Sequence, residues 1–509
     1  MTGRTNCALL TGTQVRVIDV EADVAPGIPC FEVTGNLSSI VKEARDRVRA
    51  AIKNSGIKLQ PSRITVNMAP SGIRKNGSHF DLAIAMAVMG AEGIISNKRL
   101  KNVVFIGELG LDGKINPIKA VLPIVSGCIG QAIAKCIIPK VNMGEVRYVR
   151  GIEIIGVESL RECIDYIEGV TELKPIEPEK FVQSLVTYNI DYMDIRGQKN
   201  LKRAMLIAAG GMHNILMIGP PGAGKTMAAS RLVTIMPPPD LKQCTEISNI
   251  YSIAGLLNSD KSFITNRPFR NPHYSITAAA MAGGGYNPVP GEVSLSGHGV
   301  LFLDEFNLFK PEVLELLRTP LEEGVIRINR RSGVYEFPAN FMLVAAINPC
   351  LCGYYPDRSK CNCSESDIKR HMGKISRPLM DRIDMCVRAP KVLYDDMENT
   401  AVDMEYSSEV MQQKVQKIYN IQQERFKECT FNLNSQIPIK EISKYCEMEK
   451  EAKSLIKDIY NKYDLTARSY HKLIKVARTI ADAEEHDLIT VEDICEAASY
   501  KTKEAEIDR

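Results

Sequence analysis

The sequence predicts an α/β fold in which a parallel sheet lies between layers of helices, an αβα core, followed by a C-terminal helical lid. Three continuous apolar runs, at 215–218, 300–303 and 341–347, are typical of strands buried on both faces of a parallel sheet. The first run passes through a glycine- and proline-rich loop into 227–232, which suits a helix. After about Lys391 the apolar residues recur with helical spacing, which predicts the lid.

Composition limits the classes of function. A chain of 509 residues is long enough for about three domains, each with its own core. The 64 lysines and arginines against 61 aspartates and glutamates leave a formal net charge of only +3. A nucleic-acid-binding surface must therefore be a local patch rather than a global excess of positive charge.

No segment has the features of a signal peptide or a membrane span. Polar residues interrupt the N-terminus before an apolar signal core forms, and the weakly polar run 120–134 is shorter than the roughly 20 residues of a membrane helix. We therefore expect a cytoplasmic protein with no membrane partner. In that compartment the 14 cysteines are expected to be thiols or metal ligands rather than disulfides.

The pattern divides the chain into four parts. Residues 1–172 are expected to form an α/β domain, and 173–189 contain prolines and glutamates typical of an extended connector. Residues 190–392 hold the predicted parallel-sheet core. Residues 393–509 form the predicted helical lid.

Within the first domain, strands are predicted at 14–20, 63–68 and 103–106. A helix is predicted to start near Ser38 and to stop at the turn-forming sequence Asn-Ser-Gly at 54–56. Helical spacing places four apolar side chains on one face of this helix: Ile40, Ala44, Val48 and Ala51.

The loop after the first buried strand has the spacing G-x-x-x-x-G-K-T, which indicates a phosphate-binding loop. Its backbone N–H groups and the N-terminus of the following helix favour a polyphosphate. Lys225 is expected to reach the terminal phosphates of ATP, and Thr226 to ligate Mg²⁺. The remaining residues of the predicted nucleotide loop are Gly219, Pro220, Pro221, Gly222, Ala223 and Gly224.

Polar residues follow the other two buried strands at the edge where the nucleotide loop lies. Asp304 and Glu305 come directly after 300–303, the arrangement of a Walker B element. Asp304 is expected to hold the Mg²⁺ shell and Glu305 to polarise the attacking water. Asn348 follows 341–347 and matches a sensor-1 position, where it orients water or contacts the γ-phosphate.

Two arginines are predicted to serve the nucleotide. Arg382 precedes a fourth apolar strand and is a candidate arginine finger supplied to a neighbouring subunit. Its alternative is an intramolecular ion pair with Asp381 or Asp384. Arg468, at the start of a strongly periodic helix, resembles a sensor-2 arginine.

Two segments of the first domain, 75–85 and 107–115, resemble the peptidase domain of Lon and the ribosomal-S5-like fold. Aligned on this resemblance, the family's nucleophilic serine falls on His79 and its lysine partner falls near Leu122. Serine needs a base in contact to become a nucleophile, so the resemblance implies a Lon-like domain without the peptidase dyad. Ser78 beside His79 does not restore one, because sequence neighbours rarely face one another.

The order of these nucleotide-site motifs resembles the AAA+ ATPases, in the magnesium-chelatase-like branch that also contains MCM helicases. The chain resembles the ComM/YifB proteins more closely still, through the Lon-like domain and the segments 267–273, 283–285, 290–292, 303–305 and 348–350. This resemblance implies a hexameric, ATP-driven DNA motor, a helicase that promotes branch migration in recombination and natural transformation. Two rivals stay open: a chelatase-like chaperone or protein-remodelling ATPase that does not act on DNA, and an ATP-dependent protease, which the missing dyad argues against.

A hairpin is predicted at 325–337, turning at Ser332-Gly333, with Arg327, Arg330 and Arg331 on or near its tip. In related motors such a hairpin faces the central channel, where arginines grip phosphates without reading bases. An ordinary solvated turn is the alternative. A glycine-rich stretch at 281–286 resembles a mobile insert of the MCM branch.

Cysteines form a C-x-C-x₈-C-x-C cluster directly after Asn348, through Cys350, Cys352, Cys361 and Cys363. Four thiolates are able to surround a structural Zn²⁺, although two residues more commonly separate paired ligands. Reduced thiols in a tight loop are the alternative. The nearby His371 is expected to be a solvated side chain.

Overall fold

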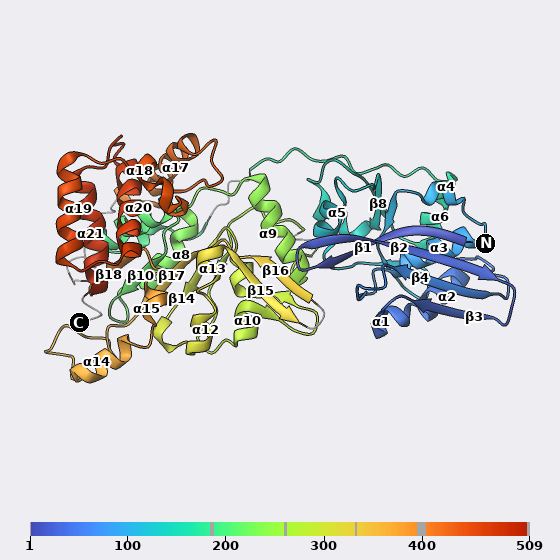
Figure 1. Ribbon diagram of the computed structural model, residues 1–509, viewed down its shortest axis with the longest axis horizontal. Coiled ribbons are helices and arrows are strands. Elements are labelled where there is room, and N and C mark those ends of the chain that lie inside the picture. The colour runs from blue at the N-terminus through green and yellow to red at the C-terminus, as the bar shows by residue number, and fades with distance from the viewer. Residues whose placement is uncertain are drawn as a thin grey trace.

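The computed structural model describes residues 2–183, 188–258, 262–330, 333–392, 394 and 404–505. The molecule is elongated, with the N-terminal domain at one end, the parallel-sheet core in the middle and the helical region at the other end (Figure 1). The predicted α/β fold with a C-terminal helical region is confirmed. No helix in the described part of the chain has both the length and the apolar character that a bilayer span requires.

The N-terminal domain is built on a seven-stranded mixed sheet of order β3-β4-β2-β1-β5-β8-β9. Its strands are β1 (Thr2–Thr11), β2 (Gln14–Ala25), β3 (Cys30–Thr34), β4 (Arg63–Ala69), β5 (Val103–Phe105), β8 (Lys135–Pro139) and β9 (Glu153–Val157). β1 and β2 form a long antiparallel hairpin, and β1, β5, β8 and β9 run parallel to one another. A separate small ribbon joins β6 (Glu108–Leu109) to β7 (Ile115–Asn116).

Helices cover both faces of this sheet. They are α1 (Ser39–Lys42), α2 (Ala44–Asn54), α3 (Asp81–Ala91), α4 (Asn97–Leu100), α5 (Val121–Cys128), the 3₁₀ helix η1 (Lys140–Val146) and α6 (Leu160–Glu168). All residues of α3 are buried, as expected for a helix that is apolar on every side and lies inside a core. α5 belongs to a second apolar cluster, which also includes residues of the parallel-sheet core.

The predicted helix from Ser38 is interrupted, and one of its predicted core residues is wrong. The chain leaves the helix after α1 and begins α2 after a turn at Glu43. This break changes the helical register, so Val41 is buried while Ile40 is 42% exposed. The other three predicted core residues, in α2, are buried.

The parallel-sheet core has five parallel strands in the order β11-β14-β17-β10-β18. They are β10 (Ile215–Ile218), β11 (Phe269–Arg270), β14 (Val300–Leu303), β17 (Met342–Ile347) and β18 (Met385–Arg388). Every residue of β10, β14 and β17 is buried, as predicted for strands covered on both faces. Their carboxyl ends share one edge of the sheet.

Helices pack on both faces of this sheet and two hairpins project from it. The helices are η2 (Tyr192–Asp194), α7 (Lys199–Gly211), α8 (Lys225–Ile235), α9 (Leu241–Ala254), α10 (Ala278–Ala282), α11 (Glu292–Leu295), η3 (Phe306–Leu308), α12 (Pro311–Glu315), α13 (Pro320–Glu323), α14 (Glu365–Met372) and α15 (Arg377–Met380). The hairpins are β12 (Gly283–Gly284) with β13 (Val289–Pro290), and β15 (Val325–Arg330) with β16 (Gly333–Pro338).

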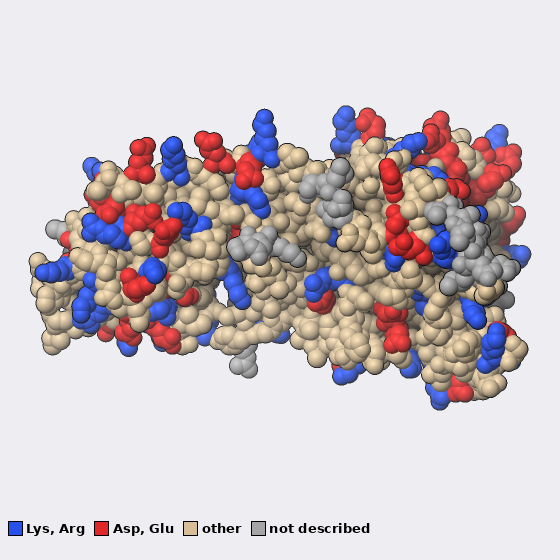
Figure 2. Space-filling view, turned by 180° about the vertical axis from the view of Figure 1, so that it is seen from behind, with Lys and Arg blue, Asp and Glu red and all other residues tan. Residues whose placement is uncertain are grey.

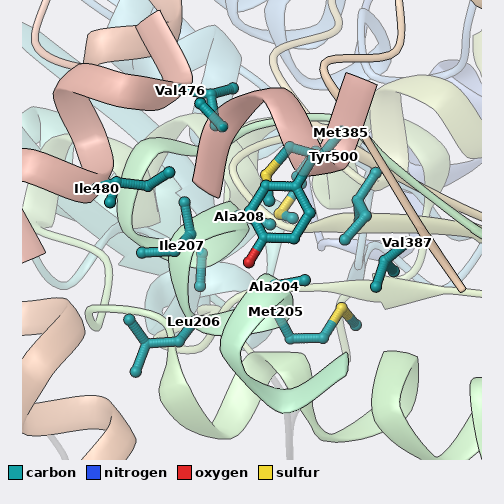
Figure 3. Close-up of a cluster of buried hydrophobic side chains, with 14 of the residues drawn as sticks. Ala204, Met205, Leu206, Ile207, Ala208, Met385, Val387, Val476, Ile480 and Tyr500 are labelled. Carbon is teal, nitrogen blue, oxygen red and sulfur yellow. The ribbon is translucent and has the colours of Figure 1, made fainter. Parts of the chain in front are cut away.

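The helical lid shares its core with the sheet. Its elements are η4 (Met404–Tyr406), α17 (Ser408–Arg425), η5 (Asn434–Gln436), η6 (Ile439–Glu441), α18 (Ile442–Tyr445), α19 (Lys450–Lys462), α20 (Ala467–Ala483) and α21 (Val491–Ala505). Figure 3 shows side chains from α20 and Tyr500 of α21 against residues of α7 and β18. The lid thus packs directly onto α7, the helix that precedes β10 and the nucleotide loop, and onto β18.

The N-terminal domain is anchored to the parallel-sheet core through α5 and α9. The backbone N–H of Ala120 donates to the carbonyl of Ser252 (3.2 Å), and the Ser252 hydroxyl donates to Glu145 (2.7 Å). Cys244 and Phe263 of the parallel-sheet core lie in the apolar cluster of α5. A second contact lies at the hairpins, where the β1–β2 turn rests on β16.

Candidate active site

The nucleotide loop joins the buried strand β10 to helix α8. Gly222 and Gly224 have φ angles of +76° and +83°, the left-handed region that glycine adopts without steric cost. α8 begins at Lys225, so its unpaired backbone N–H groups face the loop. This arrangement is the one that binds phosphate at a helix N-terminus.

The Lys225 ammonium lies at the centre of the loop and is buried. It donates to the carbonyls of Gly219 (2.6 Å) and Pro220 (3.0 Å) and to Oδ1 of Asn348 (3.0 Å). Burial lowers the pKa of Lys225 from its ordinary value, and the nearby Asp304 and Glu305 oppose that shift. A buried cation whose hydrogen bonds within the described part of the chain all go to neutral acceptors favours an anionic ligand such as a phosphate.

The two residues predicted to hold Mg²⁺ are in contact. The Thr226 hydroxyl donates to Oδ2 of Asp304 at 2.8 Å. The other carboxylate oxygen of Asp304 accepts from the backbone N–H of Glu305 at 2.9 Å. A hydroxyl and a carboxylate are the oxygen ligands that Mg²⁺ takes beside nucleotide phosphates, so the donor set fits this ion.

Glu305 has a strained backbone. Its φ of 51° and ψ of 44° place it in the left-handed region, which is uncommon for a residue with a Cβ. Such strain concentrates at functional sites. Glu305 lines the same cavity as Lys225 and Asp304, which is where a base for the attacking water must lie.

This cavity has a volume of about 580 Å³. Besides the predicted residues, it is lined by Asn271, His273 and Tyr274, which the sequence analysis gave no role. They follow β11, so they reach the same edge of the sheet as the Walker B and sensor residues. Because β11 has only two residues, its strand pattern was invisible in the sequence, although this segment contributed to the family resemblance.

Gln198, at the start of α7, also borders the loop. Its Nε2 donates to the carbonyls of Ala223 (3.2 Å) and Pro390 (2.5 Å). Its Oε1 is buried and has no hydrogen-bond partner among the described residues. A buried acceptor of this kind is costly unless it is satisfied.

Arg382 and Arg468, the two arginines predicted to act on the nucleotide, both form ion pairs with the carboxylate of Glu322 in α13. The Arg382 side chain is only 8% exposed, and it also donates to the carbonyls of Arg318 (3.0 Å) and Pro378 (2.5 Å). This burial favours the intramolecular ion pair, with Glu322 rather than with either aspartate considered above. Arg468 is 47% exposed and does not line the described cavity.

The four cysteines after Asn348 form one cluster. Their sulfur atoms all lie within 4.8 Å of one another, at Cys350, Cys352, Cys361 and Cys363. The Sγ atom of Cys350 is 3.3 Å from that of Cys352 and 3.7 Å from that of Cys361. Tetrahedral ligands with Zn–S bonds of ~2.3 Å have sulfur atoms ~3.8 Å apart, so the donor set fits Zn²⁺.

The prediction that His371 is solvated is wrong. The residue is 6% exposed, and its Nε2 lies 2.7 Å from the side-chain nitrogen of Asn307 and 3.1 Å from the carbonyl of Asn348. Burial lowers the pKa of His371. The histidine therefore supports the backbone at the sensor position rather than facing solvent.

The N-terminal domain does not join its candidate hydrolytic residues. The Ser78 hydroxyl donates to Glu108, whereas Nε2 of His79 contacts the carbonyl of Ala8 at 3.1 Å. Burial lowers the pKa of His79 to about 4, so its ring is neutral at physiological pH. Leu122, where the resemblance placed the lysine, is a buried apolar side chain in the apolar cluster of α5.

The predicted hairpin is present as β15 and β16. Arg327 forms ion pairs with Glu323 and with Glu336, so its charge is neutralised within the hairpin. Arg330 contacts only the carbonyls of Gly285 (3.3 Å) and Asn329 (3.2 Å) among the described residues. Arg331 lies outside the described residues.

Comparison with known families assigns all three regions. The family described as "Magnesium chelatase, subunit ChlI" matches residues 191–397, and "Magnesium chelatase, subunit ChlI C-terminal" matches 405–501. The family described as "Subunit ChlI of Mg-chelatase" matches 20–142.

Relatives match nearly the whole chain. Competence protein ComM of Haemophilus influenzae is 36% identical over 498 residues, which cover 96% of this chain and 95% of that protein. The chain is a ComM/YifB-like member of the magnesium-chelatase family. YifB of Escherichia coli is 34% identical over 490 residues, covering 96% of this chain and 95% of that protein. As in this family, the core is an AAA+ ATPase.

The Lon-like character of the N-terminal domain is also confirmed. A Lon protease of Roseiflexus castenholzii is 27% identical over 187 residues, covering 33% of this chain and 23% of that protein. The ComM/YifB-like architecture therefore joins a Lon-like domain to an AAA+ ATPase.

We predict that Glu305→Gln binds ATP but hydrolyses it about 100-fold more slowly or worse, because the amide cannot accept a proton from water. Steady-state phosphate release and binding of a fluorescent ATP analogue measure the two effects. Glu312→Gln, an exposed glutamate in α12, is the matched control. Normal turnover in Glu305→Gln would remove this residue from the mechanism.

Proposed function

We propose that this protein is an ATP-driven DNA motor, a helicase that promotes branch migration in recombination and natural transformation. The observation that carries the proposal is that Lys225 contacts Asn348 and Thr226 contacts Asp304 in a chain whose β15–β16 hairpin presents an arginine without a carboxylate partner among the described residues. The full-length similarity to a protein named for competence supports the proposed process.

In the proposed mechanism the nucleotide loop binds the phosphates of ATP through backbone N–H groups, and Lys225 moves from its carbonyl partners to the terminal phosphates. Thr226 and Asp304 would hold Mg²⁺, which neutralises phosphate charge when bound. Glu305 accepts the proton of the attacking water. Asn348, already bonded to Lys225, keeps that water or the γ-phosphate in position.

We propose that the protein assembles into a ring, a hexamer, in which Arg468 lies near the nucleotide site of a neighbouring subunit. Its side chain is 47% exposed and is not among the residues that line the nucleotide cavity of its own chain. A neighbouring subunit's site is a place where such an arginine neutralises transition-state charge. Arg382, buried against Glu322 and two carbonyls, would have to break these contacts to act in the same way.

The β15–β16 hairpin is the proposed DNA contact. Phosphate binding requires a cation whose charge is not already neutralised. Arg330 meets this condition among the described residues, whereas Arg327 is held between two glutamates. The phosphate contact is therefore assigned to the hairpin tip.

Zinc at the cysteine cluster would be structural. All four ligand positions are filled by protein sulfur, which leaves no open position for substrate. The cluster begins two residues after Asn348, so a bound ion would fix the loop that carries the sensor. Its contribution would be to the shape of the active site rather than to the reaction.

We predict that branched DNA raises the rate of ATP hydrolysis by the full-length protein. Phosphate release is measured with forked DNA, with linear duplex of the same length and without DNA. Fork stimulation supports the motor. A rate unaffected by any DNA, together with no DNA binding, would favour a chelatase-like or protein-remodelling ATPase instead.

We predict that Arg330→Ala weakens DNA binding and makes the slope of log K against log salt shallower by about 0.7 for each single-strand phosphate that the arginine neutralises. Fluorescence anisotropy at several salt concentrations measures both. Arg327→Ala, on the same hairpin but already neutralised, is the matched control and should change affinity much less. Equal effects of the two changes would contradict the assignment.

We predict about one tightly bound zinc ion per chain by mass spectrometry of the purified protein. Cys361→Ser should lower the zinc content and the melting temperature, because three thiolates hold the ion less tightly. Cys495→Ser, an exposed cysteine in α21, should change neither. Zinc-free protein with normal stability would leave the four residues as reduced thiols.

A further inference from the structure

A cleft between the N-terminal domain and the ATPase core is formed by loops of both. Its volume is about 780 Å³, within the ~300–1,000 Å³ typical of ligand sites. One wall comes from the β1–β2 hairpin and the loop 72–76, and the other from the turn 285–287 and the β15–β16 hairpin. Figure 2 shows the surface hollowed between the two domains.

The walls of the cleft carry positive charge only. Arg16, Arg74 and Arg330 line it, and its described lining contains no aspartate or glutamate. Arg330 is held by neutral carbonyls, so its charge remains available. Such a cleft attracts a polyanion.

An exposed aromatic ring lies among these cations. Tyr286 is 70% exposed, and the Arg74 guanidinium lies 5.2 Å from the centre of its ring. Nucleobases stack on aromatic side chains next to arginine in sites for single strands. Bases inside a duplex are already stacked and do not offer their faces in this way.

The cleft is held in shape before any ligand arrives. Lys75 is fully buried and donates to the carbonyls of Gly35 (3.1 Å) and Pro70, which ties down the loop that carries Arg74. On the other side, the β1–β2 turn rests against the backbone of Glu336 in β16. Arginines from two domains are thus presented at a fixed separation, which reduces the entropy lost on binding.

We infer that this cleft binds single-stranded DNA, with Arg16, Arg74 and Arg330 holding phosphates and Tyr286 stacking on a base. The inference rests on the proposed function, because it requires DNA as the substrate. It goes further in making the N-terminal domain a direct part of the DNA path. The Lon-like domain then supplies a binding surface in place of a peptidase site.

The absence of tryptophan from the sequence gives a direct test. Tyr286→Trp introduces a single indole at the cleft, and oligothymidine should quench its emission because a stacked base contacts the ring. A duplex of the same length should quench it less. In the Tyr286→Trp background, Arg74→Ala should raise the DNA concentration at which half of the quenching is reached. If position 286 had only a structural role, Arg74→Ala would not change this concentration.

Affinity measurements separate stacking from charge. Tyr286→Ala should weaken oligothymidine binding at least about fivefold, whereas Tyr286→Phe, which keeps the ring, should stay near wild type. Arg16→Ala and Arg74→Ala should each make the slope of log K against log salt shallower by about 0.7, the value for one single-strand phosphate. Arg45→Ala, an exposed arginine in α2 that pairs with Asp46, is the control for loss of a positive charge. Thermal melting identifies variants that fail to fold.

The outcomes distinguish this inference from the proposed function. If the wild type binds DNA, but the Tyr286→Trp emission is unchanged and the cleft variants match Arg45→Ala, the cleft is excluded while the DNA motor stands. If the wild type does not bind DNA under any salt condition, both proposals fail. Quenching with selective loss of affinity in the cleft variants supports both.

Discussion

The hydrogen bonds from Lys225 to Asn348 and from Thr226 to Asp304 are the interactions on which the site depends. They join the nucleotide loop to the ends of β17 and β14, the two strands beside β10 on one side of the sheet. A parallel sheet brings these carboxyl ends to one edge, so residues far apart in the sequence become neighbours. The loop is therefore held directly against Asp304 and Asn348, the residues predicted to be the Walker B and sensor residues. Glu305, strained beside Asp304, belongs to the same preorganised edge.

Apolar clusters connect the ATPase core to the lid and to the N-terminal domain. The lid shares one apolar cluster with α7 and β18 (Figure 3). The lid therefore packs against α7, the helix that comes before the nucleotide loop in the chain. On the opposite side, α9 carries the N-terminal domain through a separate cluster. Close packing transmits displacements because interiors contain few voids. Nucleotide-dependent movement of the core therefore has a physical route to both ends of the chain.

Features that depend on neighbouring residues in the sequence could be predicted, whereas features that depend on contacts between distant residues could not. The nucleotide loop and buried strands were predictable because spacing and apolar runs are local properties. The burial of His371 depends on Asn307, and that of Arg382 depends on Glu322, 60 positions earlier in the chain. Neither contact leaves a pattern in the neighbouring residues. The long strand β1 and the short strand β11 were missed for a related reason, since their pairing partners rather than their composition define them.

Gly12 affects how movement of β16 is passed to the N-terminal domain. A side chain at this position would come within 2.9 Å of the Glu336 backbone, so two main chains touch directly where the β1–β2 turn meets β16. With no flexible side chain between them to absorb a displacement, a swing of β16 must either push the first hairpin of the chain or separate from it. In the proposed motor, movement of the β15–β16 hairpin would therefore reach the Lon-like domain, and a protein bound to that domain would resist the movement.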